Sequence, residues 1–304
     1  MNKALLTLVL SAATLVAGAQ VVEVQSVTRV AVDGDVSVDK PRISPDGTFA
    51  VLSTNTDNAL YRVDFATGAS TKVADQGMAN DLKFSPDGST IVFKTSETRD
   101  NHLRYYSVQM VDLTDGYTRR LSKPARHCAQ FSISDAGVLS LSDNGRFSAR
   151  NMAGQKVKAA TAQPVVSIHY GHLEVTTPDG KTVTLDPQGR GSYLWPQLSP
   201  DGTKIVYYLA RHGCFVCNLD GSDVRPLGYL HGARWINNDA VVGFQDYDDG
   251  AVTYKSAIVA ADLQGTHQTL TDESIIGLNP SVSADGSRIA FATTAGELYV
   301  INLK

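Results

Sequence analysis

The amino-acid sequence predicts an all-β fold, a β-propeller of four-stranded antiparallel blades. Three observations predict it. A Ser-Pro-Asp-Gly motif returns along the chain, a second motif returns in phase with it, and no segment shows a convincing helical period. Repetition of one supersecondary unit every 40 to 50 residues or so is typical of propeller blades.

The first motif is a turn between two strands. Copies begin at Ser44, Ser85, Ser199 and Ser283, and weaker copies begin at Ser134 and Asn237. Pro presets the turn, Asp accepts backbone hydrogen bonds, and Gly adopts a positive φ. A β-rich run follows each copy, so the motif joins the first two strands (a and b) of a blade. We therefore interpret its Asp residues as turn residues rather than as a carboxylate array.

The second motif is an apolar-Asp/Asn-apolar segment in the third strand (c) of each repeat. Its central residues are Asp64, Asp112, Asn151, Asn218, Asp262 and Asn302, spaced 48, 39, 67, 44 and 40 residues apart. The 67-residue gap is too long for one blade and too short for two. It contains a reduced blade between Val165 and Leu185. Counting that blade gives seven, and merging it with its neighbour gives six.

The two ends of the chain complement each other. The last repeat ends at Lys304 after three strands, and a lone strand, Val21–Val32, precedes the first repeat. Pairing them supplies the missing fourth strand (d) and closes the ring, which leaves few exposed edges. Residues 20–304 are therefore expected to form one propeller domain.

Residues 1–19 have the pattern of a signal peptide. Lys3 precedes an apolar run, Ala4–Val16, and Ala17-Gly18-Ala19 has the small-x-small pattern of a cleavage site. The run is too short to span a bilayer comfortably, and no second such run follows, so no transmembrane segment is predicted. We expect cleavage after Ala19 and a periplasmic or secreted protein.

The net charge and the cysteines of the chain limit its possible partners and its possible disulfides. The net charge of −4 becomes −5 when Lys3 is removed, which argues against nucleic acid or an anionic membrane as partner. Of the three cysteines, Cys214 and Cys217 fall on opposite faces of one expected strand, about 10 Å apart and too far for a disulfide. We interpret them and Cys128 as small residues of packed strands.

Together the two motifs resemble the WD-like repeats of TolB-type propellers, and the same repeats occur in propellers of prolyl-oligopeptidase-type peptidases. The resemblance covers roughly residues 39–304 and implies the fold, but no specific activity. The chain lacks the Gly-x-Ser-x-Gly elbow of those peptidases. Some oligogalacturonate lyases are similar propellers that hold a metal with His side chains, and their ligands do not align with this sequence.

Antiparallel strand order divides the loops between two faces. The a–b and c–d turns share one face, called here the turn face, and the d–a and b–c loops share the other, the loop face. Arginine, histidine and aromatic residues, which suit binding hot spots, concentrate in the segments of the loop face. The candidate ligand-binding residues are Arg99, His102, Arg104, His127, Tyr193, Trp195, Arg211, His212, His231, Arg234 and Tyr247. Trp195 could instead pack between blades, and Trp235 is expected in the core.

No catalytic residue, metal site or cofactor is predicted. His127, Cys128, His212 and Cys214 have zinc-capable chemistry, but they come from non-adjacent blades. The acidic run at Asp246, Asp248 and Asp249 is interpreted as a solvated loop. Neither a Ser-His-Asp arrangement nor a Gly-rich phosphate loop before a helix can be assigned.

These features predict a non-enzymatic module of the cell envelope that binds a protein, peptide or glycan on the loop face. An accessory subunit of an envelope complex is a related possibility. The alternative from a different class is a metal-dependent carbohydrate-active enzyme, similar to the oligogalacturonate lyases, that uses His residues at the channel mouth. Convergent His side chains favour the enzyme, and a broad aromatic and Arg surface favours binding.

The leader makes one direct prediction. Intact-mass measurement of the protein from the envelope fraction should show a chain that begins at Gln20, because the motif Ala17-Gly18-Ala19 directs cleavage there. A full-length chain retained in the cytoplasm is the contrary result.

Overall fold

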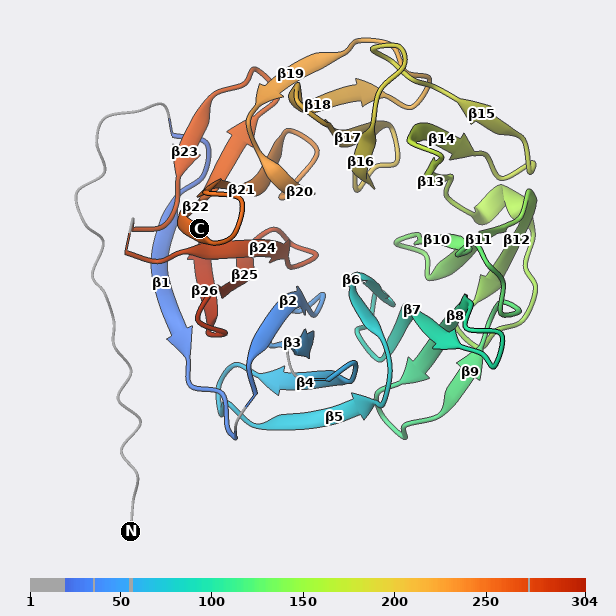
Figure 1. Cartoon of the computed structure of the whole chain (residues 1–304), viewed down its shortest axis with the longest axis horizontal. Coiled ribbons are helices and arrows are strands. Elements are labelled where there is room, and N and C mark those ends of the chain that lie inside the picture. Colours follow the sequence, from blue (N-terminus) through green and yellow to red (C-terminus); the bar gives the residue numbers. More distant parts are fainter. Residues whose placement is uncertain (1–19, 35, 55–56, 273) are drawn as a thin grey trace.

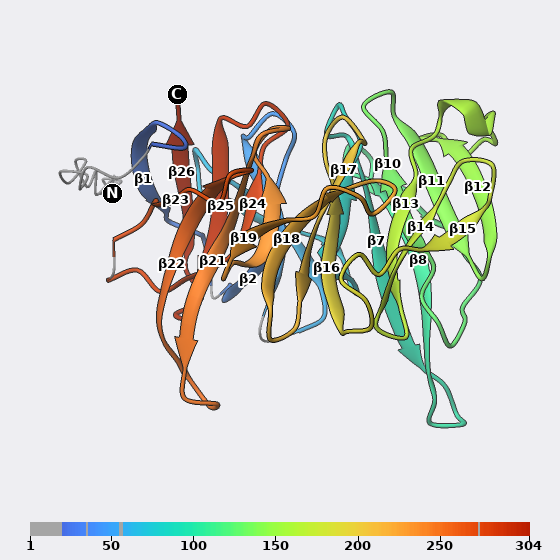
Figure 2. The same ribbon diagram turned by 90° about the horizontal axis from the view of Figure 1, so that it is seen from above.

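The computed structural model describes residues 20–304 except 35, 55–56 and 273. The expected signal peptide, residues 1–19, lies outside the described residues. Seven antiparallel sheets surround a central axis (Figure 1), and edge-on they form a disc (Figure 2). The prediction of a seven-bladed all-β propeller is confirmed, and the six-bladed count is wrong because the reduced repeat forms its own sheet.

Each blade begins with its innermost strand. The first blade has β2 (Val38–Ile43), β3 (Phe49–Thr54), β4 (Leu60–Asp64) and β5 (Ser70–Ala74). The second has β6 (Met78–Phe84), β7 (Thr90–Thr98), β8 (Arg104–Asp112) and β9 (Thr118–Arg120). The fifth has β16 (Tyr193–Leu198), β17 (Lys204–Leu209), β18 (Gly213–Asn218) and β19 (Arg225–Gly228). The sixth has β20 (His231–Trp235), β21 (Ala240–Asp248), β22 (Thr253–Asp262) and β23 (His267–Thr269). The seventh has β24 (Gly277–Val282), β25 (Arg288–Thr293), β26 (Leu298–Leu303) and β1 (Val24–Val30).

The third and fourth blades have three strands each. They are β10 (Gln130–Ile133), β11 (Val138–Asp143) and β12 (Arg146–Asn151), then β13 (Val165–His169), β14 (His172–Thr176) and β15 (Thr182–Thr184). A short 3-10 helix, η1 (Ala159–Thr161), joins these two blades. Within the described part of the chain, no helix is long and apolar enough to cross a membrane.

The a–b turns close through side chains, as the motif predicts. In the second blade, the Ser85 hydroxyl donates to Asp87 at 2.5 Å and accepts from the Thr90 amide at 2.9 Å. The glycine of the motif has φ between +71° and +73° in all five copies that carry one. Hydrogen bonds from Ser85 and Ser89 lower the pKa of Asp87. The charged carboxylate therefore stabilises the fold above the unfolded-state pKa of 3.8, and this contribution is lost as the pH falls through the lower folded-state value.

The ring closes between the two ends of the chain. Strand β1 pairs antiparallel with β26, from Val24 opposite Leu303 to Val30 opposite Leu298. Val30 is buried, and Val24 and Val27 pack against the apolar cluster of the sixth and seventh blades. The predicted closure by the N-terminal strand is confirmed. The seventh sheet thus has four strands although the last repeat supplies only three.

The hydrophobic core is divided among the contacts between neighbouring blades. One cluster joins Val206 and Val216 of the fifth blade to Val241 and Val259 of the sixth. Equivalent clusters lie at five other blade junctions. Cys214 and Cys217 belong to clusters on opposite faces of β18, as expected, and all three cysteines are free. Cys128 lies in the loop before β10 and is half-buried, so its interpretation as a residue of a packed strand is wrong. At these six junctions, a blade therefore buries apolar side chains only together with its neighbour.

The fourth blade runs in the opposite direction to its neighbours. Gly171, just after β13, accepts a hydrogen bond from the amide of Tyr193 at the start of β16. Gln163, just before β13, lies against Gly202 in the turn that follows β16. The third blade causes this reversal, because its last segment forms only an isolated bridge at Lys156 and does not return to the loop face. Six strands separate the starts of β10 and β16, so the original direction is restored in the fifth blade.

Closure yields a stability prediction. Deletion of residues 21–32 should lower the free energy of unfolding by roughly 5 kcal/mol, since it removes six valines from contact with the adjacent clusters. The single change Val30→Ala should cost about 2 kcal/mol. Chemical denaturation measures both.

A neighbouring side chain provides the control. Arg29 is exposed and pairs with Glu297 at 3.0 Å on the surface, so Arg29→Ala should change stability by less than about 1 kcal/mol. Unfolding midpoints that stay unchanged after the deletion contradict the closure model.

Candidate binding face and channel

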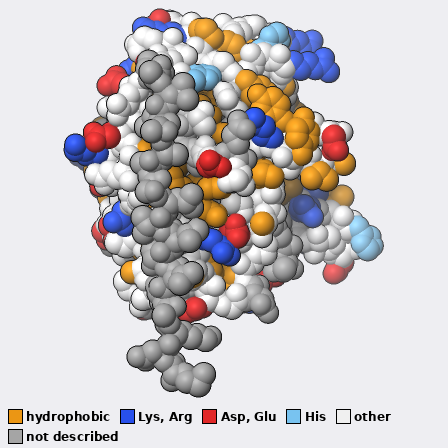
Figure 3. Space-filling view, turned by 90° about the vertical axis from the view of Figure 1, so that its left-hand side faces the viewer, with side chains coloured by type: hydrophobic (Ala, Val, Ile, Leu, Met, Phe, Trp, Pro, Cys, Tyr) orange, Lys and Arg blue, Asp and Glu red, His pale blue; other side chains and the backbone are white. Residues whose placement is uncertain are grey.

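Exposed hydrophobic side chains gather on the loop face. Among the described residues, nine large hydrophobic side chains are exposed. Seven belong to loop-face segments: Leu103, Tyr170, Trp195, Tyr229, Tyr247, Val252 and Tyr254. The other two are Tyr117 in a c–d turn and Val183 in an outer strand. Figure 3 views the disc from its edge with the loop face to the right, where hydrophobic side chains cluster.

Two long hairpins project from this face. The strands of β7–β8 and β21–β22 have nine or ten residues each, whereas most others have three to seven. Figure 2 shows both hairpins extending beyond the body of the disc on the same side. Tyr247, Val252 and Tyr254 lie near the tip of the second hairpin. The carboxylates of Asp248 and Asp249 accept the backbone amides of its turn, which agrees with their interpretation as loop residues.

An aromatic cluster surrounds His231 at the start of β20. The rings of Tyr208 and Tyr229 both lie 4.6 Å from the imidazole, and the Trp195 ring lies 5.4 Å away. His231 Nδ1 lies 2.7 Å from the Asp246 carboxylate, which orients the ring. Burial and the nearby carboxylate of Asp246 raise the pKa of Tyr229 to about 12, so this phenol stays neutral. His231 itself is mostly buried, so it supports the surface more than it forms it.

Trp195 joins this cluster to the channel mouth. Its ring packs against Tyr208 of the fifth blade and His231 of the sixth, and its side chain still remains 46% exposed. The residue has φ of +51°, a strained value for a bulky side chain, and it lies in a bulge of β16. Such strain persists where the surroundings impose it and is frequent at binding sites. Trp235, by contrast, is 8% exposed and donates its indole N–H to the Gln197 carbonyl, so its expected core position is confirmed.

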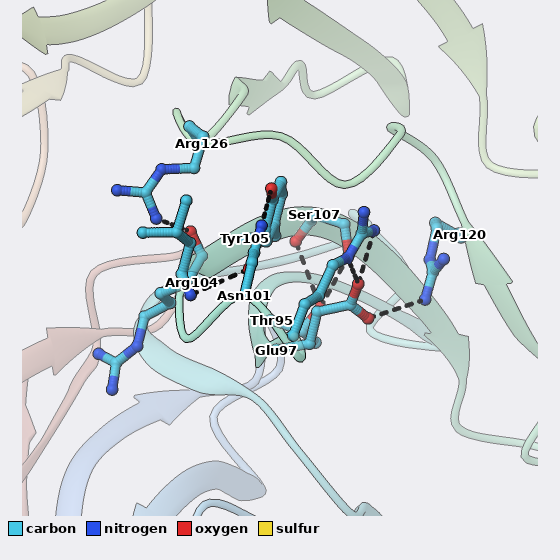
Figure 4. A network of polar contacts seen from close by, with 10 residues as sticks. Thr95, Glu97, Asn101, Arg104, Tyr105, Ser107, Arg120 and Arg126 are labelled. Carbon is cyan, nitrogen blue, oxygen red and sulfur yellow. Dashed lines mark hydrogen bonds and ion pairs between the residues drawn. The ribbon is translucent and has the colours of Figure 1, made fainter.

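The β7–β8 hairpin carries a cationic group (Figure 4). Arg99 lies over the Tyr105 ring at 4.2 Å and pairs with Glu97 at 2.8 Å. Arg126, which the sequence analysis did not select, donates to the Arg104 carbonyl at 2.7 Å. The side chains of His102 and Arg104 are exposed beside them. The arginine–tyrosine stack is a preformed surface that could contact a planar or anionic group.

The remaining candidates lie apart from one another on the same face. Arg211 and His212 are exposed in the β17–β18 turn, and His127 lies 3.2 Å from the Asp143 carboxylate. Among the residues that the structure describes, no three His, Cys, Asp or Glu side chains come together as a potential metal site. Burial raises the pKa of the Cys128 thiol to about 11, so it is protonated at neutral pH.

Two candidates are not on the loop-face surface, which corrects the sequence interpretation. Tyr193 is fully buried, and its hydroxyl donates to the Gly189 carbonyl and accepts the Gln188 amide. It anchors the loop before β16 and cannot contact a surface ligand. Arg234 lies inside the central channel, because a bulge between His231 and Arg234 turns its side chain toward the axis.

The same bulge recurs in the innermost strands of five blades. The residues that follow it are Arg42, Lys83, Gln197, Arg234 and Ser281. All five line one cavity of about 270 Å³ in the channel. In four of the blades the channel residue stands two positions before the Ser of the turn motif. Sequence reasoning missed Arg42 and Lys83, although this fixed offset could have identified them.

No family model and no curated protein matches this chain. A similar solved structure is that of "putative TolB" from Agrobacterium tumefaciens, with a TM-score of 0.54 and 19% sequence identity. The match covers 89% of this chain and 91% of that one. At this level of identity, the likeness shows a shared fold.

The two tryptophans of the chain allow a test of the site geometry. Acrylamide should quench most of the emission of Trp195, which is 46% exposed, and little of that of Trp235, which is 8% exposed. Trp195→Phe should therefore remove most of the quenchable fluorescence, while Trp235→Phe should retain it. Equal Stern–Volmer constants in the two variants contradict this geometry.

Proposed function

We propose that the chain is an exported propeller that binds a protein, peptide or glycan of the cell envelope through its loop face. The supporting observation is the concentration of seven of the nine exposed large hydrophobic side chains on that face. Folding does not require this asymmetry, because both faces of a propeller are built from loops. Clustered exposed hydrophobic groups mark interaction sites in soluble proteins.

The composition of the face supports the same proposal. Tyr and Trp present large rigid surfaces at a low entropic cost, and Arg adds directional hydrogen bonds. Tyr229, Tyr247 and Tyr254 lie in adjacent segments around the sixth blade, with Trp195 beside them at the channel mouth. The convergence of His side chains that the enzymatic alternative requires is not found among the described residues. Export and the envelope location rest on the sequence of residues 1–19.

Photocrosslinking in intact cells tests the proposal. A benzoylphenylalanine that replaces Tyr254 or Tyr229 should give a covalent adduct with the partner, whereas one that replaces Tyr117 on the turn face should not. Mass spectrometry identifies the adduct as protein or carbohydrate. Adducts that form mainly from position 117 place the partner on the wrong face and refute the proposal.

Affinity and stability should then separate two classes of variant. With the purified partner, Tyr247→Ser should raise Kd about 5- to 30-fold, as expected for a hot-spot side chain worth about 1–2 kcal/mol. Asp87→Ala should lower the free energy of unfolding by about 1 kcal/mol, because it removes the turn hydrogen bonds, and leave Kd unchanged. If Tyr247→Ser binds normally, this side chain is not part of the site.

A further inference from the structure

Four cationic side chains meet in the middle of the channel. Arg42 comes from β2, Lys83 from β6, Lys94 from β7 and Arg234 from β20. Arg42 and Lys94 are each 7% exposed. The charges of Arg42 and Arg234 each lower the pKa of Lys83, and Arg234 acts in the same way on Arg42. Strands of the first, second and sixth blades therefore bring like charges together.

The acidic groups beside this cluster are fewer. Asp81 lies 2.8 Å from the Lys94 ammonium. Its negative charge also acts to raise the pKa of Arg42, Lys83 and Arg234. The charge of Asp39 also acts to raise the pKa of Arg42, but the Asp39 carboxylate forms an ion pair with Lys40. Within the described residues, Asp81 is thus the one carboxylate shared by the four cations. The cluster has a net positive charge in a site walled by protein, where charges are screened weakly.

The ammonium of Lys83 can accommodate a further hydrogen-bond acceptor. Its ammonium donates to the neutral Gln197 amide oxygen at 3.2 Å, and an ammonium has three donors. Burial, followed by the charges of Arg234 and Arg42, lowers the pKa of Lys83 to about 8. The ammonium form is thus costly in this buried position, and an adjacent anion would stabilise it.

Space for a ligand adjoins these groups on both sides. One cavity, of about 270 Å³, extends toward the turn face beside Pro45 and Pro200. A second cavity, of about 300 Å³, extends toward the loop face and ends beside Trp195. Lys83, Gln197, Leu198 and Arg234 line both cavities. Gln130, Ser132 and Ser167 add neutral hydrogen-bonding groups to the second cavity.

We propose that the channel binds an oxyanion, a carboxylate or phosphate-type group, that reaches Lys83 and Arg234 through the cavity on the loop-face side, with Arg42 contributing from the adjoining cavity. Guanidinium groups match the planar oxygen pairs of such anions, and the ammonium adds a point charge. The neutral amide and hydroxyl groups around the cavity can satisfy further oxygens. This site is separate from the partner surface of the proposed function, because its residues line the channel rather than the outer face.

The pH dependence follows from the charged groups around Lys83. Arg42 faces it from β2, Asp81 from β6, Lys94 from β7 and Arg234 from β20. Burial lowers the pKa of Arg234 to about 10, so Lys83 loses its proton before Arg234 as the pH rises. Anion affinity should therefore be high at pH 7 and fall as the pH passes 8. Binding near pH 8 should also take up a proton.

Isothermal titration of the mature protein tests the site. The probes are sulfate, a tetrahedral oxyanion, and succinate, a dicarboxylate, compared with chloride at equal ionic strength. We expect sulfate or succinate to bind at least 10-fold more tightly than chloride at pH 7, and the preferred probe indicates which ligand class the site accepts. Binding no tighter than that of chloride by either probe overturns the proposal.

Variants locate the binding and check its cause. Lys83→Met should weaken the binding of the preferred probe at least 10-fold. The control Lys72→Met, at an exposed lysine of β5, should leave the affinity unchanged. Lys83→Arg should keep binding at pH 7 and remove its loss between pH 7 and pH 9, because the guanidinium remains charged. If Lys83→Met does not fold, Lys83→Arg alone decides the question. An unchanged pH profile in Lys83→Arg overturns the assignment to Lys83.

Discussion

The pairing of β1 with β26 is the constraint on which the rest of the structure depends. Apolar side chains of one blade are buried against the next at six of the junctions between blades, and one of these clusters joins the seventh blade to the first across the closure. The strand that completes the ring comes from the N-terminal end of the described chain. The β1–β26 pairing thus links the two ends of the described chain and holds the channel residues around a common axis.

The number of strands explains how the ring accommodates an irregular repeat. The third and fourth blades have three strands each, so together they contribute an even number. The fourth blade runs backward, and the alternation of strands is restored at β16. As a result the Tyr170-Gly171 turn lies on the loop face, next to Tyr193. Tyr170 is therefore one of the exposed aromatic side chains of the loop face.

The two faces of the disc have different chemistry for a physical reason. On the turn face, Ser and Asp side chains are occupied by the hydrogen bonds that close each a–b turn, as at Ser85 and Asp87. The loop face has no such common motif, so its segments vary in length and composition. Side chains such as Tyr254 and Trp195 can therefore remain exposed there. The innermost strands add a third environment, because their bulges turn polar residues toward the axis.

The sequence by itself determined the local features that repeat. Turn chemistry specified the blades through Ser85-Pro86-Asp87-Gly88 and its copies, and the two incomplete ends indicated closure. The place of Trp235 inside an expected first strand of a blade also predicted its core position. These properties follow from hydrogen bonds and φ angles within a few residues, so short segments carry them. The assignment of most candidate residues to the loop face had the same origin, because antiparallel order decides which loops lie together.

Only the tertiary structure decided which distant residues meet. It buried Tyr193, turned Arg234 into the channel, and brought Arg42, Lys83 and Lys94 to the same place. Bulges in the innermost strands shift the side-chain register, and simple alternation along a strand does not reveal where such a shift occurs. Convergence at the axis further depends on the number of blades and on ring closure. Arg42, Arg234 and the lysines of the second blade become neighbours only when the ring is complete.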